Sequence, residues 1–221
     1  LLLAQEGVIA IESSYLLNMI NNMVFDFIYH EHLSYFSILP FENFLKKFGL
    51  KLIRIQKIGT KGGSLRYYMA RNNSKWKIDE SVYKLKKIEK NFKVSKKTFN
   101  NFNKKINIIH NNLINYLSKN KKLNIVGYGA SATTTTLISH FKLNNIFNYL
   151  VDENPDKINT FSPGFHVPVY NIKKLTIDKP NIIIILAWRY KKQILQKLKK
   201  INLKCLAVTP MPKLEVKLLK I

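Results

Sequence analysis

The sequence is poor in the residues that cross-link or interrupt small proteins: its 221 residues include one Cys, 8 Gly and 7 Pro. A single Cys205 excludes an intramolecular disulfide, and nothing in the cysteine usage argues for an oxidising compartment. A hydrophobic fraction of 46% excludes a disordered or collagen-like chain. No apolar run approaches the roughly 18 residues of a membrane span, since the longest, 182–188, has the length of a strand. We therefore expect a cytoplasmic protein that does not associate with a membrane.

Acidic residues and arginine are scarce beside lysine. The chain has 37 Lys and Arg against 13 Asp and Glu, a formal net charge of +24, yet only 4 of its residues are Arg. Nucleic-acid-binding surfaces use Arg for bidentate and stacking contacts, whereas AT-rich codons produce an excess of Lys, Asn and Ile without functional selection. We attribute the charge to composition and do not expect a nucleic-acid partner. The second interpretation is a basic surface that steers an anionic substrate.

The first of three segments, residues 1–72, reads as the end of a sheet domain. Its pattern predicts a buried strand at 8–13, a helix at 41–48, and further strands at 50–58 and 64–69. Strand–helix–strand order with apolar strands is typical of the final half of an α/β sheet domain.

The other two segments are a helical connector at 73–118 and a second α/β domain at 119–221. In the connector, apolar residues recur every three or four positions without Gly or Pro, which predicts one long amphipathic helix or two in line. A dimerising coiled coil and a nucleic-acid-binding helix are the alternatives. In the last segment strands and helices alternate, which predicts a parallel, Rossmann-like sheet. The expected strands are 123–128, 147–151, 181–187 and 203–208, and the expected helices are 131–143 and 190–201.

Proton-transfer groups are densest at Tyr29-His30-Glu31-His32. A histidine base works near neutral pH, a neighbouring carboxylate can orient it, and a tyrosine can donate to a developing enolate oxygen. Metal binding is a weaker interpretation, because residues at i and i+2 share a face only on a strand and no HExxH or cysteine cluster is present. Structural histidines are the third possibility. We expect no metal site.

Two glycine motifs suggest anion binding. The pair Gly62-Gly63, followed by Ser64 and Arg66, would let backbone N–H groups and a guanidinium approach a phosphate or carboxylate; a hairpin turn is the alternative.

The second motif, residues 127–132 (GYGASA), resembles GxGxxA between a strand and a helix, which places a pyrophosphate at the helix start. Gly127, Gly129 and Ser131 would line that site. Asp152, 25 residues after Gly127, stands where an acidic ribose ligand is expected. Packing glycines are the alternative here.

Taken in order, FDFIYHEHLSYFS, GGSLRYY, GYGASATTTTL, VDENPDK, PGFHVPV and LAWRY resemble the sugar C-methyltransferase family. The resemblance implies methyl transfer from S-adenosylmethionine to a ring carbon of a nucleotide-linked keto-sugar. It implies an α/β fold in which 1–72 is the end of a class I methyltransferase-type sheet domain, 73–118 a helical connector and 119–221 a Rossmann-like C-terminal domain. The family's zinc-binding domain and most of its S-adenosylmethionine site would precede Leu1, so we expect this fragment to be inactive alone.

The resemblance also implies residue roles. His32 would be the general base that removes the proton next to the keto group, with Glu31 and Tyr29 polarising the base and holding the sugar. The motif Gly62–Arg66 would lie near the active site. The family's pattern has Lys-Gly-Asn after GASA, where this chain has three threonines at 133–135, so a phosphate contact of that Lys is lost. Gly127, Gly129 and Ser131 therefore stay a nucleotide-site hypothesis. An NAD-dependent oxidoreductase or nucleotide-binding domain is the alternative function.

Overall fold

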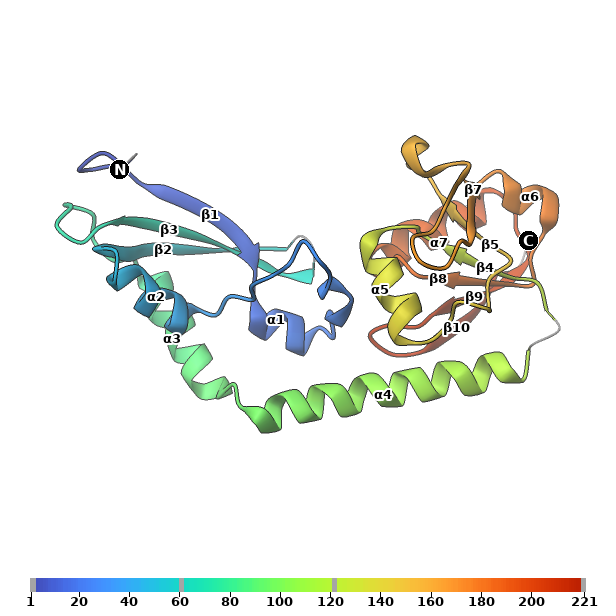
Figure 1. Ribbon diagram of the computed structural model, residues 1–221, viewed down its shortest axis with the longest axis horizontal. Helices are drawn as coiled ribbons and strands as arrows, with labels where there is room; N and C mark the ends of the chain where they lie inside the picture. The colour runs from blue at the N-terminus through green and yellow to red at the C-terminus, as the bar shows by residue number, and fades with distance from the viewer. Residues whose placement is uncertain (1–2, 60–61, 121–122, 220–221) are drawn as a thin grey trace. The chain divides into compact units, whose positions relative to one another are not determined.

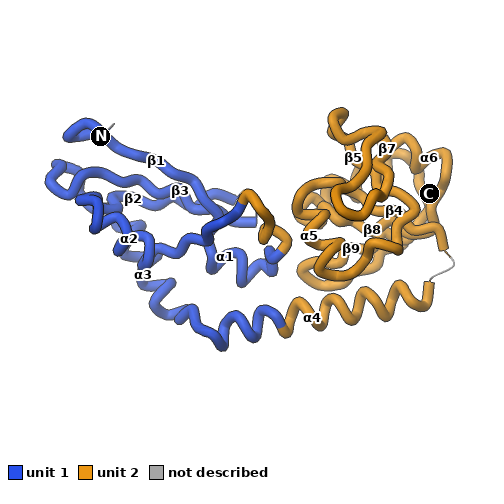
Figure 2. Tube along the Cα trace, viewed as in Figure 1, with its two compact units in different colours: residues 1–25, 32–103 blue, residues 26–31, 104–221 orange. Residues whose placement is uncertain are grey.

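A computed structural model describes residues 3–59, 62–120 and 123–219, which fall into two compact units (Figure 2). Unit 1 comprises Leu1–Phe25 and His32–Asn103, and unit 2 comprises Asp26–Glu31 and Lys104–Ile221. The short segment Asp26–Glu31 therefore belongs to a different unit from the residues on either side of it. It contains three of the four residues of the Tyr29–His32 motif.

Unit 1 is built on a three-stranded antiparallel sheet with the strand order β1-β3-β2. Helices α2 and α3 pack on one face of it (Figure 1). The strands are β1 (Ile9–Ser14), β2 (Leu50–Ile58) and β3 (Ser64–Arg71), and the helices are α1 (Leu16–Asn21), α2 (Ile38–Lys46) and α3 (Glu80–Phe92).

Alternation along β3 builds the core of unit 1. Side chains of a strand point to opposite faces in turn, so Leu65, Tyr67 and Met69 share one face, and each is 1% exposed or less. Their apolar partners come from β2, α2 and α3, and burying such side chains stabilises the unit by roughly 1.5–3 kcal/mol each. These partners are Leu52, Ile55, Phe41, Leu45, Val82 and Leu85.

A buried carboxylate joins helices α2 and α3 of unit 1. Ser37, at the N-cap of α2, makes no side-chain cap. Instead Glu89 of α3, 5% exposed, accepts from the N–H groups of Ile38 at 2.7 Å and Leu39 at 2.9 Å. It also accepts from the Tyr15 hydroxyl at 3.2 Å. Since the first N–H groups of a helix have no intrahelical partner, Glu89 satisfies α2 from a neighbouring helix.

The first predicted strand lies where it was expected, but the prediction that it is buried is wrong. Within the described residues β1 pairs with β3 alone, and Ile11 is 45% exposed.

The predicted connector consists of two helices. Helix α3 ends at Lys93, which has a φ of +50°, and α4 (Lys96–Ser118) follows. Ser95 and Thr98 start α4 as a reciprocal cap: each backbone N–H donates to the other residue's hydroxyl, at 3.2 and 3.4 Å. No described helix has the length and apolar character that crossing a membrane requires.

Unit 2 holds a seven-stranded sheet with the order β10-β9-β8-β4-β5-β7-β6. The five inner strands are parallel, and β10 and β6 pair antiparallel at the two edges. Helices α5, α6 and α7 and the later part of α4 belong to the same unit (Figure 2). The strands are β4 (Ile125–Tyr128), β5 (Tyr149–Asp152), β6 (Thr160–Phe161), β7 (Pro168–Asn171), β8 (Ile182–Ile185), β9 (Cys205–Thr209) and β10 (Glu215–Leu219). The helices are α5 (Ala132–His140), α6 (Lys174–Asp178) and α7 (Lys191–Lys200).

The order of the parallel strands identifies the point at which successive strands are added to the opposite side of the sheet. Counted along the chain, β4 is the first parallel strand, β5 and β7 lie to one side of it, and β8 and β9 to the other. The strand order reverses between β4 and β8, which is the switch point at which doubly wound sheets bind ligands. The loop after β4 and the loop after β8 therefore flank the site that the fold favours.

Candidate active site

The Tyr29–His32 motif follows a buried 3-10 turn, η1 (Phe25–Phe27). Its own residues are accessible: Tyr29 and His32 are half-buried, and the side chains of His30 and Glu31 are 83% and 66% exposed. The carboxylate of Glu31 lies 4.0 Å from Nε2 of His30. An exposed pair at that distance contributes little to stability, so the motif offers acid–base groups to solvent rather than a buried ion pair.

Asp26, just before the motif, is the most deeply buried charged residue of the segment, at 0% exposure. Both of its carboxylate oxygens accept from Nη1 of Arg189 at 2.8 Å, and Oδ2 also accepts from the indole N–H of Trp188 at 2.9 Å. Burial raises the pKa of Asp26, while Arg189 and Trp188 act in the opposite direction. All these residues belong to unit 2.

Arg189 connects this segment to the loop after β4. Its guanidinium lies 4.5 Å from the ring centre of Phe27 and 4.9 Å from that of Trp188, within the range of cation–π attraction. Its Nη2 donates to the hydroxyl of Thr133 at 3.1 Å, and that hydroxyl lies 2.8 Å from Oγ of Ser131. The network thus runs from η1, through the loop after β8, to the first turn of α5.

The predicted glycine turn packs against residues upstream of the motif, inside unit 1. Gly62 and Gly63 have φ values of +85° and +111°. A Cβ on Gly62 would lie 2.8 Å from Val24, and one on Gly63 would lie 2.5 Å from Nδ2 of Asn18. The carbonyl of Gly62 accepts from the Asn22 side chain at 2.9 Å. Close packing and backbone conformation therefore account for both glycines here.

Ser64 and Arg66 lie on β3. Ser64 is buried opposite Ser14 in the register, and Arg66 stands opposite Glu12. Nη2 of Arg66 donates to that carboxylate at 2.8 Å, and this hydrogen bond raises the pKa of Arg66. The guanidinium, 40% exposed, is thus already paired across the sheet, and a substrate anion would have to compete with Glu12.

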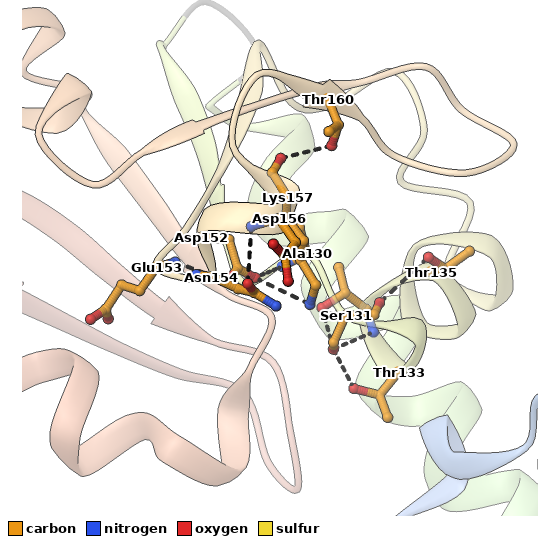
Figure 3. A network of polar contacts seen from close by, with 11 residues as sticks. Ala130, Ser131, Thr133, Thr135, Asp152, Glu153, Asn154, Asp156, Lys157 and Thr160 are labelled. Carbon is orange, nitrogen blue, oxygen red and sulfur yellow. Dashed lines mark hydrogen bonds and ion pairs between the residues drawn. The ribbon is translucent and has the colours of Figure 1, made fainter.

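The loop after β4 is held by the loop after β5 (Figure 3). Asp152 accepts from the N–H groups of Ala130 at 2.7 Å, Glu153 at 2.8 Å and Asn154 at 2.9 Å. Both of its oxygens therefore bind backbone, one of them in the loop where a pyrophosphate was expected. Asp152 here braces two loops rather than presenting a free carboxylate to a ribose.

The glycines of this loop also have packing roles. A Cβ on Gly127 would lie 2.5 Å from Leu150 and 2.7 Å from Leu186. A Cβ on Gly129, which has a φ of +108°, would lie 2.8 Å from that of Ala187. Ser131 is the N-cap of α5, because its Oγ accepts from the Thr134 N–H at 3.3 Å. The switch point is therefore tightly packed at its base, with hydroxyl groups above it.

The described residues hold no group of three or more His, Cys, Asp or Glu side chains that could bind a metal ion. They also do not fit S-adenosylmethionine. The sheet of unit 1 is antiparallel throughout, so it lacks a parallel strand that feeds a glycine-rich loop and a helix. The comparable loop of unit 2 has its Ala130 N–H bound to Asp152.

Sequence reasoning missed the residues that anchor the motif. Asp26 lies more than 160 positions from Trp188 and Arg189, so no local spacing joins it to them. The available signals were that Asp26 is the single charge in an apolar run and that Arg189 is one of only four arginines.

Comparison with known proteins decides the family. Residues 59–212 match the C-methyltransferase C-terminal domain. The chain belongs to this family. The matched region contains β3, α3, α4 and the parallel strands of unit 2, and it begins after the Tyr29–His32 motif.

A full-length relative extends the likeness beyond that region. The chain is 24% identical over 199 residues to the C-methyltransferase NovU of Streptomyces niveus. The alignment covers 88% of this chain and 47% of the relative, so the chain spans about half the length of the curated C-methyltransferase that it matches. The predicted resemblance is thereby confirmed at the level of the family.

Proposed function

We propose that this C-methyltransferase chain supplies the proton-abstracting part of an enzyme that methylates a ring carbon of a nucleotide-linked keto-sugar. His32 is the general base. The supporting observation is that His32 is half-buried rather than enclosed and lies next to the exposed Glu31, so a substrate can reach it. A base enclosed by aliphatic side chains would have no access to a sugar.

The chemistry needs one base and one oxyanion donor. A neutral imidazole nitrogen of His32 takes the proton from the carbon next to the keto group, and the C–H electron pair moves to the carbonyl oxygen as an enolate. Tyr29 donates a hydrogen bond to the sugar oxygen, and Glu31 stabilises the imidazolium that forms. The enolate carbon is then the nucleophile for methylation, and the imidazolium proton leaves to solvent.

The methyl donor implied by the family is S-adenosylmethionine, which supplies an electrophilic methyl group when bound. Because the described residues do not fit it, we assign no residue of this chain to the donor. Proton removal is the step that this chain's own side chains perform.

The nucleotide of the substrate is assigned to unit 2, at the loop after β4. Gly127 and Gly129 keep that loop close to the sheet, and Ser131 and the threonines after it present hydroxyl groups at the start of α5. A contribution to substrate binding is also assigned to the Gly62–Arg66 motif, in which Ser64 is the first residue of β3. We further propose the domain limits 1–72, 73–118 and 119–221.

The test is methyl transfer by the complete protein that carries this chain. A nucleotide-linked keto-sugar is compared with the same sugar reduced to the alcohol, which lacks an acidic C–H. We expect methylation of the keto-sugar alone, and at least a 100-fold loss of kcat in His32→Asn. Methylation of the alcohol, or an unchanged kcat in His32→Asn, would contradict the proposal.

A further inference from the structure

We propose that Asp26 and Arg189 are a positioning pair for catalysis: their buried ion pair holds the segment Asp26–Glu31 so that the Tyr29–His32 motif faces the sugar correctly. The inference rests on the proposed function. It assigns a role to two residues outside the motif, on contacts that lie within unit 2.

The segment is short and irregular beyond η1. It forms no helix or strand there, and the N–H of Tyr29 donates to the carbonyl of Phe27 at 3.1 Å. Two side chains hold the Asp26 carboxylate: Nη1 of Arg189 donates to both oxygens, and the Trp188 indole N–H donates to one. The same guanidinium lies 4.5 Å from the ring centre of Phe27. Asp26, three residues before Tyr29, is therefore a fixed point of the segment.

The partner of Asp26 is itself fixed by the sheet. Trp188 and Arg189 lie in η4 (Trp188–Tyr190), directly after β8. The N–H groups of Leu186 and Ala187 donate to the carbonyl of Tyr128 at 3.0 and 3.1 Å, which ties this loop to the end of β4. The Arg189 side chain is only 14% exposed and also donates to Thr133. The carboxyl ends of the central strands β4 and β8 thus set the position of Asp26.

Position matters here because proton abstraction depends steeply on the distance and angle between base and C–H bond. A misplacement of about 1 Å can cost on the order of 100-fold in rate. Loss of the pair therefore lowers turnover although neither side chain touches the reacting atoms. An arginine that bound the nucleotide phosphate instead would act on KM.

The variants are Asp26→Asn, Arg189→Gln and the double variant. Each single change leaves a buried partner without its counter-charge, which destabilises the fold, whereas the double change leaves two neutral hydrogen-bonding groups. The double variant therefore separates stability from positioning. Glu42→Gln is the matched control, since Glu42 forms another ion pair of low exposure, with Lys86 at 2.6 Å, on α2.

The readout is kcat per active site in the complete protein, with active sites counted by the stoichiometry of keto-sugar nucleotide binding. We expect at least a tenfold loss of kcat per site in both single variants and in the double variant, with KM changed less than threefold. The thermal midpoint recovers in the double variant. Glu42→Gln keeps its kcat per site.

Three outcomes would overturn the assignment. One is a loss of binding stoichiometry with kcat per site unchanged, which indicates a purely structural pair. Another is a raised KM with unchanged kcat, which indicates nucleotide binding. The third is recovery of kcat in the double variant. His32→Asn is measured alongside: if it retains activity, the proposed function fails whatever the pair does, and if it is inactive while Asp26→Asn is not, only the pair fails.

In the 221-residue chain itself, amide hydrogen exchange gives a readout without activity. We expect Asp26→Asn to speed exchange across the segment Asp26–Glu31 by at least tenfold, with β2 and β3 unchanged. Unchanged exchange in that segment would show that the pair does not hold it.

Discussion

Glu89 stabilises unit 1 more than its charge alone suggests, because it serves two helices at once. Replacing it by Ala leaves the N–H groups of Ile38 and Leu39 and the Tyr15 hydroxyl without their acceptor. We expect Glu89→Ala to lower the free energy of unfolding by about 2–4 kcal/mol, because buried donors lose their partner. Urea denaturation measures it. Glu80→Ala, on the exposed side of the same helix, should cost less than about 1 kcal/mol, and equal costs would contradict this role.

Substitutions at two glycines with positive φ distinguish the cost of backbone strain from the cost of steric contact. Gly49 has a φ of +67° and open space around a Cβ, so Gly49→Ala should cost about 1 kcal/mol of unfolding free energy. Gly63 has a φ of +111° and lies against Asn18, so Gly63→Ala should cost about 2–3 kcal/mol. Denaturation curves of the two variants decide it. A smaller loss for Gly63→Ala than for Gly49→Ala would show that the turn relaxes freely.

At the scale of elements, the sequence predicts best where the apolar pattern is continuous or strictly alternating. The run at 181–187 predicted β8, and the alternation at 64–69 predicted β3. Two strands of unit 2 were not predicted: β7 begins at Pro168 in a stretch rich in turn residues, and β10 follows Pro210 and Pro212. Prolines there mark loop ends next to short strands, and local patterns do not distinguish the two.

At the site, too, features that depend on neighbours in sequence were predictable and features that depend on distant residues were not. Local geometry was predictable for the glycine turn and for Ser131 as a helix cap, because both depend on neighbours in sequence. The role of Asp152 depends on the N–H of Ala130, and that of Asp26 on Arg189. These pairings come from the order of strands in the sheet, which periodicity does not encode.

Helices α4 and α5 meet through an aromatic contact that makes unit 2 sensitive to acid. His110 stacks on Phe141 with ring centres 5.3 Å apart, and burial together with His110 lowers the pKa of His140. As pH falls from 7 to 5 the unfolded chain takes up this proton first, so the neutral imidazole's contribution to stability is lost.

We therefore expect His140→Gln to reduce the loss of unfolding free energy between pH 7 and pH 5. Urea denaturation at several pH values measures this. His166→Asn, which removes an exposed imidazole at a φ of +53°, is the control and should follow the wild-type curve. A His140→Gln curve parallel to that of the wild type would contradict the link.

At the scale of the whole molecule, the residues of the acid–base motif are divided between the two units. Tyr29, His30 and Glu31 belong to unit 2, and His32 belongs to unit 1. The anchors precede the motif in sequence: Asn22 and Val24 contact the glycine turn in unit 1, and Asp26 contacts Arg189 in unit 2. We therefore place the proposed functional centre of the chain at this motif, with His32 as the proposed base.

Solvent deuterium uptake tests that claim most directly. The complete protein is incubated in D₂O with the nucleotide-linked keto-sugar, and deuterium at the carbon next to the keto group is followed by NMR. We predict enzyme-dependent uptake that His32→Asn abolishes and that the adjacent, more exposed His30→Asn changes by less than about threefold. Uptake that persists in His32→Asn, or that disappears only in His30→Asn, would contradict the account.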